Sequence, residues 1–287
     1  MIKNYIKTAL RSIRANRFFS ILNISGLAIG ICVSLLLFAF IRQELSFDTM
    51  YSKADNIYRL HMQLSAEYNR KKMIDLPNAV GPALKSDIAQ VDNMVRLVKD
   101  GYGATASIRV GDENFNEKQL YLADSTLFSI FDFQFIEGNV HAAFLNKKSI
   151  VLSHSTKEKL FGKSEALGKL ISINQRDTVQ VTGVFKDLPA NSTLDCNMVM
   201  NIMDSWMGQN VHWSNASYET YILLKKGADP TMVAQQATEL IDKYVEKDHR
   251  YYTQFFLQPL LQVHLYSPNR GEGVTKRMGN IDTIRTL

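Results

Sequence analysis

The sequence predicts an α+β protein in which one N-terminal transmembrane helix is followed by a mixed α+β domain outside the cytoplasm. Two observations carry this prediction. Residues 18–41 contain no charged residue, and the residues after them alternate strand-like and helix-like apolar patterns with turn-forming residues in between. Hydrophobic residues make up 46% and charged residues 21% of the 287 residues, which is typical of a folded chain. This length accommodates one large body or two lobes.

The N-terminal tip holds the whole net charge of the chain. Residues 1–17 contain five of the 33 Lys and Arg residues and no acid, which leaves 28 cations and 28 acids in the rest. A nucleic-acid-binding domain carries its positive charge on the folded body, so we expect no nucleic acid partner. We expect instead an amphipathic helix at 1–17 whose basic face contacts the headgroups of a lipid membrane. This face consists of Lys3, Lys7, Arg11 and Arg14.

Residues 18–41 are predicted to span the membrane. At a rise of about 1.5 Å per residue they form a helix of about 36 Å, enough to cross a hydrocarbon core of about 30 Å. The run is longer than the apolar core of a signal peptide and ends in Phe-Ala-Phe-Ile, which is a poor cleavage site. Cations before the span and a neutral mixture after it place the N-terminus in the cytoplasm and residues 42 onward outside.

The span contains a possible helix-packing motif, and two interpretations of it stay open. Gly26 and Gly30 form a GxxxG, whose small residues let a second helix approach closely, but one such motif in a transmembrane helix also arises by chance. Asn23 favours a helix partner, because a polar amide at that depth needs a hydrogen bond.

Four features are predicted in the first half of the following body, before a short helical turn. The patterns predict a helix that continues to residue 50, a strand at 57–64, a helix at 77–88, and a hairpin of 104–110 with 115–122. Ser125 is expected to cap a short helical turn, and the phenylalanines around that turn are expected to fill a core. They are Phe128, Phe131, Phe133 and Phe135.

The second half repeats the alternation. The patterns predict a strand at 149–153, a helix at 156–161, a hairpin of 170–174 with 178–185, a strand at 218–224, a helix at 230–245 and a strand at 255–265. The helix at 230–245 has Asp229 as its N-cap and Pro230 as its first residue. Its apolar stripe consists of Val233, Ala237, Leu240, Ile241 and Tyr244. Residues 269–287 are polar and rich in glycine, which indicates a linker.

No motif predicts catalysis, a metal or a cofactor. The stretch 161–164, Phe-Gly-Lys-Ser, lacks the first glycine of a phosphate-binding loop, and the six histidines form no ligand motif. Ser153 and His154 lack a nucleophile elbow. Asp48 and Asp55 are interpreted as solvated surface carboxylates. Cys32 and Cys196 are interpreted as two unpaired thiols. We therefore expect no catalytic, metal-binding or cofactor-binding residues.

Five blocks of the sequence carry a resemblance to a known family. They are ALRSIRANRFFSILNISGLAIGI, ELSFDTMYSKADNIYRL, LADSTLFSIFDFQFIEGN, SIVLSHSTKEKLFG and VTGVFKDLPANSTLD. Together these blocks resemble the MacB/FtsX-type permeases of ABC transporters, in the form common in Bacteroidetes. The resemblance covers residues 9 to about 195, and the remaining residues are consistent with the end of the same domain.

The resemblance implies a domain organisation. Residues 1–17 would be a cytoplasmic elbow helix, 18–41 the first span, 42–268 a MacB-like periplasmic core domain, and 269–287 a linker towards a second span. Members of this family have further spans after the core domain. We therefore expect this chain to be the front part of a permease, which can present the domain but lacks the helices that receive a power stroke.

The resemblance also implies a function and partners. Such permeases lie in the bacterial inner membrane as homodimers or paired permeases. A separate ABC ATPase subunit hydrolyses ATP and drives export or mechanotransmission, and a periplasmic adaptor is a further candidate partner. The permease itself is not an enzyme. Cargo in the family ranges over antimicrobial peptides, macrolides and lipoproteins, and some branches transport nothing.

Two other functions stay open behind this one. The chain can be a single-span sensory or ligand-binding module, which requires a pocket with convergent polar groups. A membrane-anchored hydrolase ranks third, because only isolated Ser and His residues support it.

Overall fold

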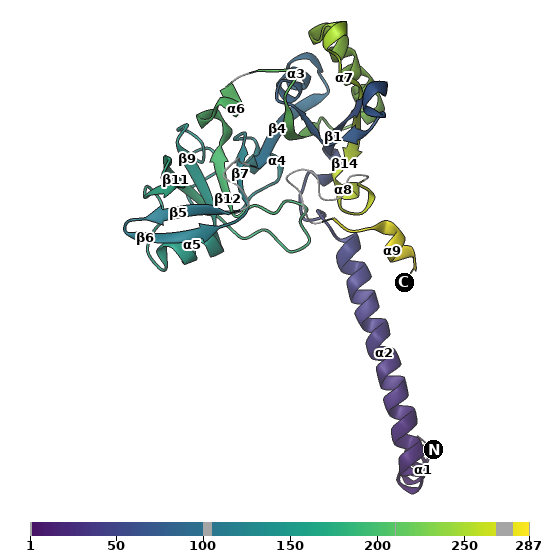
Figure 1. Ribbon diagram of the computed structural model, residues 1–287. Coiled ribbons are helices and arrows are strands. Elements are labelled where there is room, and N and C mark those ends of the chain that lie inside the picture. Colours follow the sequence, from purple (N-terminus) through teal and green to yellow (C-terminus); the bar gives the residue numbers. More distant parts are fainter. Residues whose placement is uncertain (1, 100–104, 210, 268–277, 287) are drawn as a thin grey trace. The chain divides into compact units, whose positions relative to one another are not determined.

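The computed structural model describes residues 2–99, 105–209, 211–267 and 278–286 (Figure 1). The chain forms two compact units, Met1–Ser46 with Asp282–Leu287, and Phe47–Ile281. Each unit is described by itself below.

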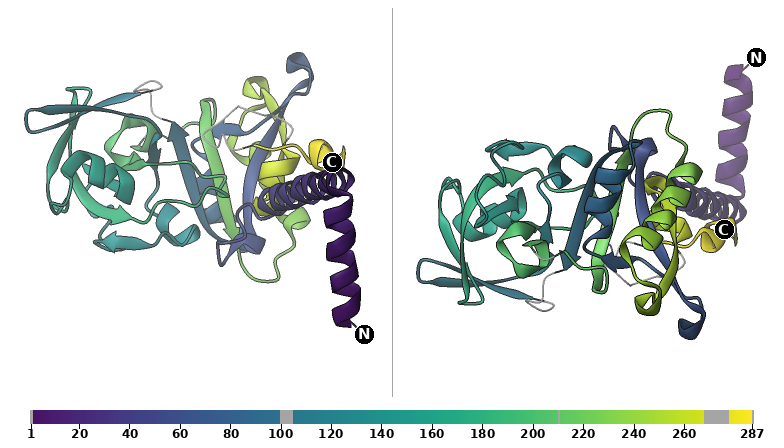
Figure 2. Two further views of the ribbon diagram at one scale, coloured as in Figure 1. Left: turned by 90° about the horizontal axis from the view of Figure 1, so that it is seen from below. Right: turned by 90° about the horizontal axis from the view of Figure 1, so that it is seen from above.

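The first unit is helical. Helix α1 (Ile2–Ala15) and helix α2 (Arg17–Leu45) meet at Asn16, whose φ of −113° and ψ of 55° are not helical. Figure 2 shows that α1 turns away from the axis of α2 at this point. Among the described residues, α2 is the one helix long and apolar enough to cross a membrane. Part of the linker predicted at 269–287 forms helix α9 (Ile281–Thr286), and residues 269–277 and 287 of that segment lie outside the described residues.

The predicted continuation of the first long helix to residue 50 is wrong. Helix α2 ends at Leu45, where the Ser46 N–H bonds back to the Gln43 carbonyl. The next residues turn into the second unit, in which Phe47 and Asp48 are buried. Burial of these side chains outweighs the helical propensity of the segment.

The second unit is built on a four-stranded antiparallel sheet. Its strands are β1 (Ile57–Leu64), β4 (Val91–Lys99), β13 (Ala216–Leu224) and β14 (Tyr252–Pro259), in the order β14-β1-β13-β4. Helix α3 (Val80–Asp87) connects β1 to β4, and helix α7 (Pro230–Tyr244) connects β13 to β14. Two interleaved βαβ units in this order make a ferredoxin-like fold. We call this half, residues 47–99 and 211–267, the ferredoxin-like lobe.

Smaller elements complete this lobe. Strand β2 (Lys72–Met73) pairs with β1, and β3 (Asp75–Pro77) pairs with β13. Helix α8 (Leu260–Tyr266) follows β14. Three 3-10 turns lie at Ala54–Asn56, Ala66–Tyr68 and Lys247–His249.

Residues 105–209, between β4 and β13, form a second half that we call the inserted lobe (Figure 1). Its strands are β5 (Ala106–Val110), β6 (Glu113–Glu117), β7 (Leu120–Ala123), β8 (Phe135–Glu137), β9 (Ser149–Ser153), β10 (Leu170–Ile173), β11 (Asp177–Phe185) and β12 (Met198–Asn201). Its helices are α4 (Leu127–Ile130), α5 (His154–Phe161) and α6 (Trp206–Gln209), with a 3-10 turn at Ile202–Asp204. Strand β7 pairs with β4, so the sheet runs from one lobe into the other in the order β4-β7-β12-β9-β11-β10-β5-β6, with β8 beside β11.

Three hydrophobic cores hold the second unit together. One fills the space between the ferredoxin-like sheet and helices α3 and α7, and another lies inside the inserted lobe. The third is shared by both lobes, because it joins Val95 and Tyr221 of the ferredoxin-like sheet to Phe128 and Phe131 of the inserted lobe. The predicted phenylalanine core is therefore confirmed, with Phe135 half-buried at its margin.

The two lobes bear out the predicted α+β class, and several elements are confirmed. Strand β1 has its predicted bounds, the 170–185 hairpin is present, and the Asp229 side chain accepts a hydrogen bond from the Thr231 N–H as the N-cap of α7. The stripe of α7 is buried except for Tyr244, which is 41% exposed and stacks on Trp213.

Other elements differ from the prediction. The strand predicted at 255–265 ends at Pro259, and residues 260–266 are helical, because proline cannot continue the ladder of hydrogen bonds and Leu260, Val263 and His264 are buried with helical spacing. The segment predicted as one strand at 115–122 is two strands with different partners, β6 and β7. Thr126, rather than Ser125, occupies the N-cap of α4. Strands β4 and β12 were not predicted, because their buried residues do not alternate with polar ones.

Candidate functional site

The chain enters the second unit at a buried aromatic contact. Phe47 lies two residues after the end of α2, and its ring stacks on the imidazole of His264 from α8, with ring centroids 3.4 Å apart and an interplanar angle of 1°. Helix α8 is the last described element of the ferredoxin-like lobe. The first residues of this unit therefore pack directly against its last helix.

The next residue, Asp48, binds the other lobe. Its backbone N–H donates to the Asn191 carbonyl at 2.9 Å, and its Oδ1 accepts the Thr193 N–H at 2.8 Å. Three residues further on, the Tyr51 hydroxyl and Ser192 Oγ are 2.7 Å apart. Residues 189–193 of the inserted lobe are therefore attached to the chain immediately after α2. We call these contacts the Asp48 latch.

A second carboxylate, on the inserted lobe, binds the residues that follow α2. Asp132 belongs to the inserted lobe, and its Oδ2 accepts the Ser52 N–H at 2.9 Å and the Ser52 hydroxyl at 2.5 Å. Lys53 Nζ is 3.2 Å from Asp132 Oδ1. Burial alone would raise the pKa of Asp132, but the bonds from Ser52 and Lys53 outweigh it and hold that pKa below its ordinary value.

The ferredoxin-like lobe also contains a buried ion pair. Arg59 of β1 and Glu219 of β13 are 3.3 Å apart, and both side chains are fully buried. The Tyr221 hydroxyl donates to Glu219 Oε1 at 2.7 Å, while Arg59 Nη2 donates to Gln258 Oε1 at 2.9 Å and to Ser267 Oγ at 2.6 Å. The pair therefore joins strands β1, β13 and β14 to the end of α8.

His61 lies on the same strand as Arg59 and shares its partner. His61 Nε2 is 2.7 Å from Gln258 Oε1, and the ring is buried. Burial, followed by the nearby Arg59 charge, lowers the pKa of His61 to about 4. The imidazole is therefore neutral at ordinary pH.

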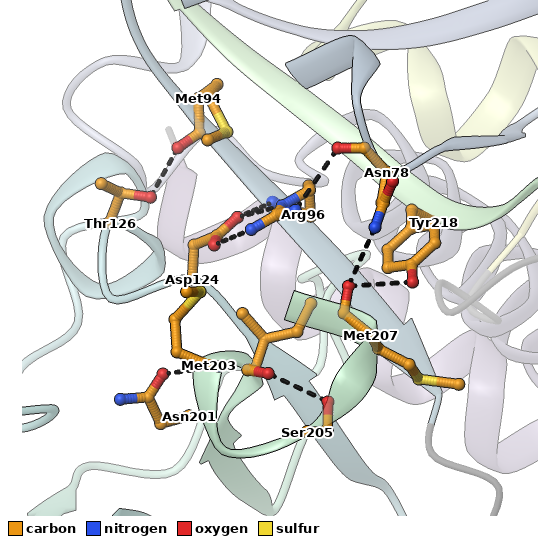
Figure 3. A network of polar contacts seen from close by, with 11 residues as sticks. Asn78, Met94, Arg96, Asp124, Thr126, Asn201, Met203, Ser205, Met207 and Tyr218 are labelled. Carbon is orange, nitrogen blue, oxygen red and sulfur yellow. Dashed lines mark hydrogen bonds and ion pairs between the residues drawn. The ribbon is translucent and has the colours of Figure 1, made fainter. Parts of the chain in front are cut away.

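Figure 3 shows a third set of polar contacts, where the two lobes meet beside β4. Arg96 of β4 donates through Nε to Asp124 Oδ2 at 2.9 Å and through Nη2 to Asp124 Oδ1 at 2.7 Å, which makes a bidentate pair. Burial would lower the pKa of Arg96, but the hydrogen bond and charge of Asp124 raise it. Asn78 Nδ2 and the Tyr218 hydroxyl both donate to the Met207 carbonyl of α6, at 3.1 and 3.0 Å. These contacts fix the inserted lobe to the ferredoxin-like lobe.

The helix-packing residues predicted from sequence lie together on α2. Asn23, Gly26 and Gly30 are three and four residues apart, which places them on one face of the helix. In the single chain this face is exposed, and a Cβ added at either glycine would meet nothing within 4 Å. The packing role of the three residues stays a prediction.

The predicted basic face lies on α1. Lys7, Arg11 and Arg14 are exposed, and the side chain of Lys3 lies outside the described side chains. The contact of this face with lipid also stays a prediction.

One surface assignment from sequence is wrong. Asp55 is exposed as expected, but Asp48 is fully buried. The sequence analysis also missed the partners of Asp48, because Thr193 is 145 residues away. Arg59 carried a weak signal, since it is a charged residue inside an otherwise apolar strand pattern.

The described residues contain no group of three His, Cys, Asp or Glu side chains that could hold a metal ion. Ser153 accepts the Thr156 N–H as the N-cap of α5, and His154 is 3.9 Å from Glu158, so the two do not form a nucleophile and its base. A groove of about 540 Å³ lies between α7 and β14, lined in part by Tyr58, Ala234, Phe256 and Leu257.

The solved structures that are similar to this chain include three extracytoplasmic or permease domains. A domain of a permease protein from Porphyromonas gingivalis has a TM-score of 0.62 at 21% identity, covering 73% of this chain and 92% of that one. The periplasmic region of MacB from Actinobacillus actinomycetemcomitans gives 0.52 at 16%, covering 73% and 91%. The extracellular domain of the ABC-type transporter YknZ from Gram-positive bacteria gives 0.51 at 18%, covering 71% and 100%. No protein with a curated description matches the sequence.

The two-lobed sheet therefore has the fold of the extracytoplasmic domains of permeases and transporters of this kind. Within that class, the family model of the MacB-like periplasmic core domain matches residues 20–240. The chain belongs to this family, as its sequence blocks predicted.

Proposed function

We propose that this chain acts in a MacB/FtsX-type permease of the bacterial inner membrane, with its N-terminus in the cytoplasm and residues 42 onward in the periplasm. A separate ABC ATPase subunit would hydrolyse ATP, and this chain would transmit the resulting helix motion to its periplasmic domain for export or mechanotransmission. A homodimer or paired permease is the expected assembly, and a periplasmic adaptor is a further candidate partner. Family membership supports this assignment.

The observation that carries the proposal is the double attachment of the residues after α2. Phe47 contacts α8 of the ferredoxin-like lobe, whereas Asp48, Tyr51 and Ser52 contact the inserted lobe. Adjacent residues, all within six positions of the first residue of the second unit, therefore hold different lobes. A displacement of α2 at this point would load both attachments and move one lobe against the other.

The test measures the distance between the lobes during ATP turnover. Cys32 and Cys196 are first replaced by Ser and Ala, and spin labels are attached at Lys163→Cys of the inserted lobe and Lys226→Cys of the ferredoxin-like lobe, both exposed positions. The permease is reconstituted with its ATPase in nanodiscs. We expect the distance distribution from electron–electron double resonance to differ between the ATP-bound and nucleotide-free states. An unchanged distribution while ATP is hydrolysed would contradict the proposal.

The groove between α7 and β14 supports the second candidate, a ligand-binding module. This function predicts that a small molecule binds in the groove. Saturable binding that is lost when Ala234→Trp fills the groove, with no change of lobe distance on ATP turnover, would favour the module over the permease.

A further inference from the structure

The Asp48 latch combines three features that ordinary structural contacts do not share. Its carboxyl group is fully buried, its Oδ2 accepts no hydrogen bond from any described residue, and its backbone adopts a φ of 60°. A positive φ is uncommon for a residue with a side chain, although Asp tolerates it better than most. A buried carboxylate with one unsatisfied oxygen is costly, because it has exchanged water for hydrogen bonding to one residue, Thr193.

The surroundings of the latch do not neutralise this cost. Helix α8 presents His264 and strand β1 presents Arg59, whose charges favour the ionised carboxylate. Strand β13 presents Tyr221, whose hydroxyl is bonded to Glu219, and Glu219 is also the ion-pair partner of Arg59. The segment 189–193 of the inserted lobe offers uncharged groups, which are the backbone of Asn191 and Thr193 and the hydroxyls of Ser192 and Thr193.

We infer that Asp48 is a protonation-controlled latch: its neutral form fits the buried site and holds residues 189–193 of the inserted lobe, and its ionised form favours release of these residues and return of the carboxylate to water. This inference rests on the proposed function, because it assigns regulation to the attachment through which α2 would move the inserted lobe.

The direction follows from linkage. Burial, offset in part by the Thr193 bonds, raises the pKa of Asp48 from an ordinary value near 3.8 to about 6. A group that binds its proton more tightly in the closed latch stabilises that closed form at low pH. The stabilisation is lost as the pH rises from about 3.8 through about 6. The latch therefore opens more readily in neutral than in mildly acidic surroundings.

Asp132 of the inserted lobe provides a comparison, because it also contacts the residues that follow α2. It also has a positive φ, of 48°, and also joins the two lobes, but its two oxygens accept bonds from Ser52 and Lys53. Its pKa is lowered rather than raised, so it stays ionised throughout the range in which Asp48 titrates. Asp48 is therefore the contact that changes its charge in this pH range, and Asp132 is a contact that does not.

The experiment measures hydrogen exchange of the full chain in nanodiscs, without an ATPase. The peptide that spans residues 189–195 contains the Thr193 amide, which donates to Asp48. After correction for the intrinsic pH dependence of exchange, we expect the opening equilibrium of this peptide to increase about tenfold between pH 5 and pH 7.5. Residues 216–224 of β13 are the internal reference for a folded domain.

Two variants assign the effect. Asp48→Asn is neutral at every pH, so we expect strong protection of residues 189–195 at pH 7.5 and loss of the tenfold change. Asp132→Asn should retain that change, because it removes the untitrated attachment. A flat response in the unsubstituted protein would overturn the inference. So would a tenfold change that persists in Asp48→Asn, which would assign the pH response to a group other than Asp48. A pH-dependent latch in a chain whose lobes do not respond to ATP would instead overturn only the proposed function.

Discussion

At the scale of single residues, the stability of this domain is sensitive to substitution of its buried charged residues. Arg59 and Glu219 are both fully buried, and each depends on the other for compensation. Removing two charges together costs little when the space is refilled, whereas removing one leaves the other uncompensated in a medium of low polarity. The ion pair therefore contributes little net stability, but either single substitution is severe.

This asymmetry gives the first prediction. Arg59→Met or Glu219→Gln alone should lower the free energy of unfolding by about 3–5 kcal/mol, and the double variant should lose clearly less than the sum of both. Urea unfolding followed by tryptophan fluorescence measures this. Lys243→Met is the control, because the pair of Lys243 with Asp87 is at the surface, and its loss should change stability far less than loss of the buried pair. Additive effects of the two buried substitutions would contradict the coupling.

His61 gives a prediction of opposite sign to that of Asp48. Its pKa is lowered from an ordinary value near 6.5 to about 4, so the unfolded chain binds a proton more readily than the folded one. The stability that depends on neutral His61 is fully present above pH 6.5 and is lost as the pH falls towards 4, by up to about 3 kcal/mol. In His61→Gln, which keeps a partner for Gln258, the unfolding free energy should lose this acid dependence. An unchanged pH profile would show that the ring is not desolvated.

At the scale of helices and strands, elements with a regular apolar pattern could be predicted, whereas elements that are apolar throughout could not be delimited. Helix α7 could be predicted because Asp229, Pro230 and an apolar stripe all point to the same boundaries. Strand β14 and helix α8 were merged into one strand, because residues 255–265 are apolar throughout and only Pro259 marks the break.

The candidate site depends on contacts rather than on patterns. Asp48 meets Thr193 across 145 residues, and Phe47 meets His264 across more than two hundred, so no local spacing encodes either contact.

Helix α2 carries the prediction that belongs to this scale. Its exposed Asn23, Gly26 and Gly30 face is suited to a second helix, because small residues permit close approach of two backbones. Replacing Gly26 and Gly30 by Leu should weaken self-association in a quantitative membrane-association assay by several-fold. The control is Ala28→Leu, which adds apolar bulk on the opposite side of α2. Equal association of all three forms would contradict the packing role of the glycines.

At the scale of the whole molecule, several attachments join the two lobes. They include the β4–β7 pairing, the Arg96–Asp124 pair, the shared hydrophobic core and the residues that follow α2. Of these attachments, the last is formed by residues directly after α2 in the sequence. Under the proposed function it is the attachment that a movement of α2 would reach first, and this is why the chemistry of Asp48 matters.

The proposed function requires that the two ends of α2 face different compartments. Five cations precede α2 and the charges after it are balanced, so we expect Lys7 in the cytoplasm and Lys226 in the periplasm. In a background without Cys32 and Cys196, Lys226→Cys should react with a membrane-impermeant maleimide added to intact spheroplasts, because it is exposed on the ferredoxin-like lobe. Lys7→Cys should react only after the membrane is permeabilised. Reaction of Lys7→Cys in intact spheroplasts would reverse the orientation and place the Asp48 latch in the cytoplasm, where it could not respond to periplasmic pH.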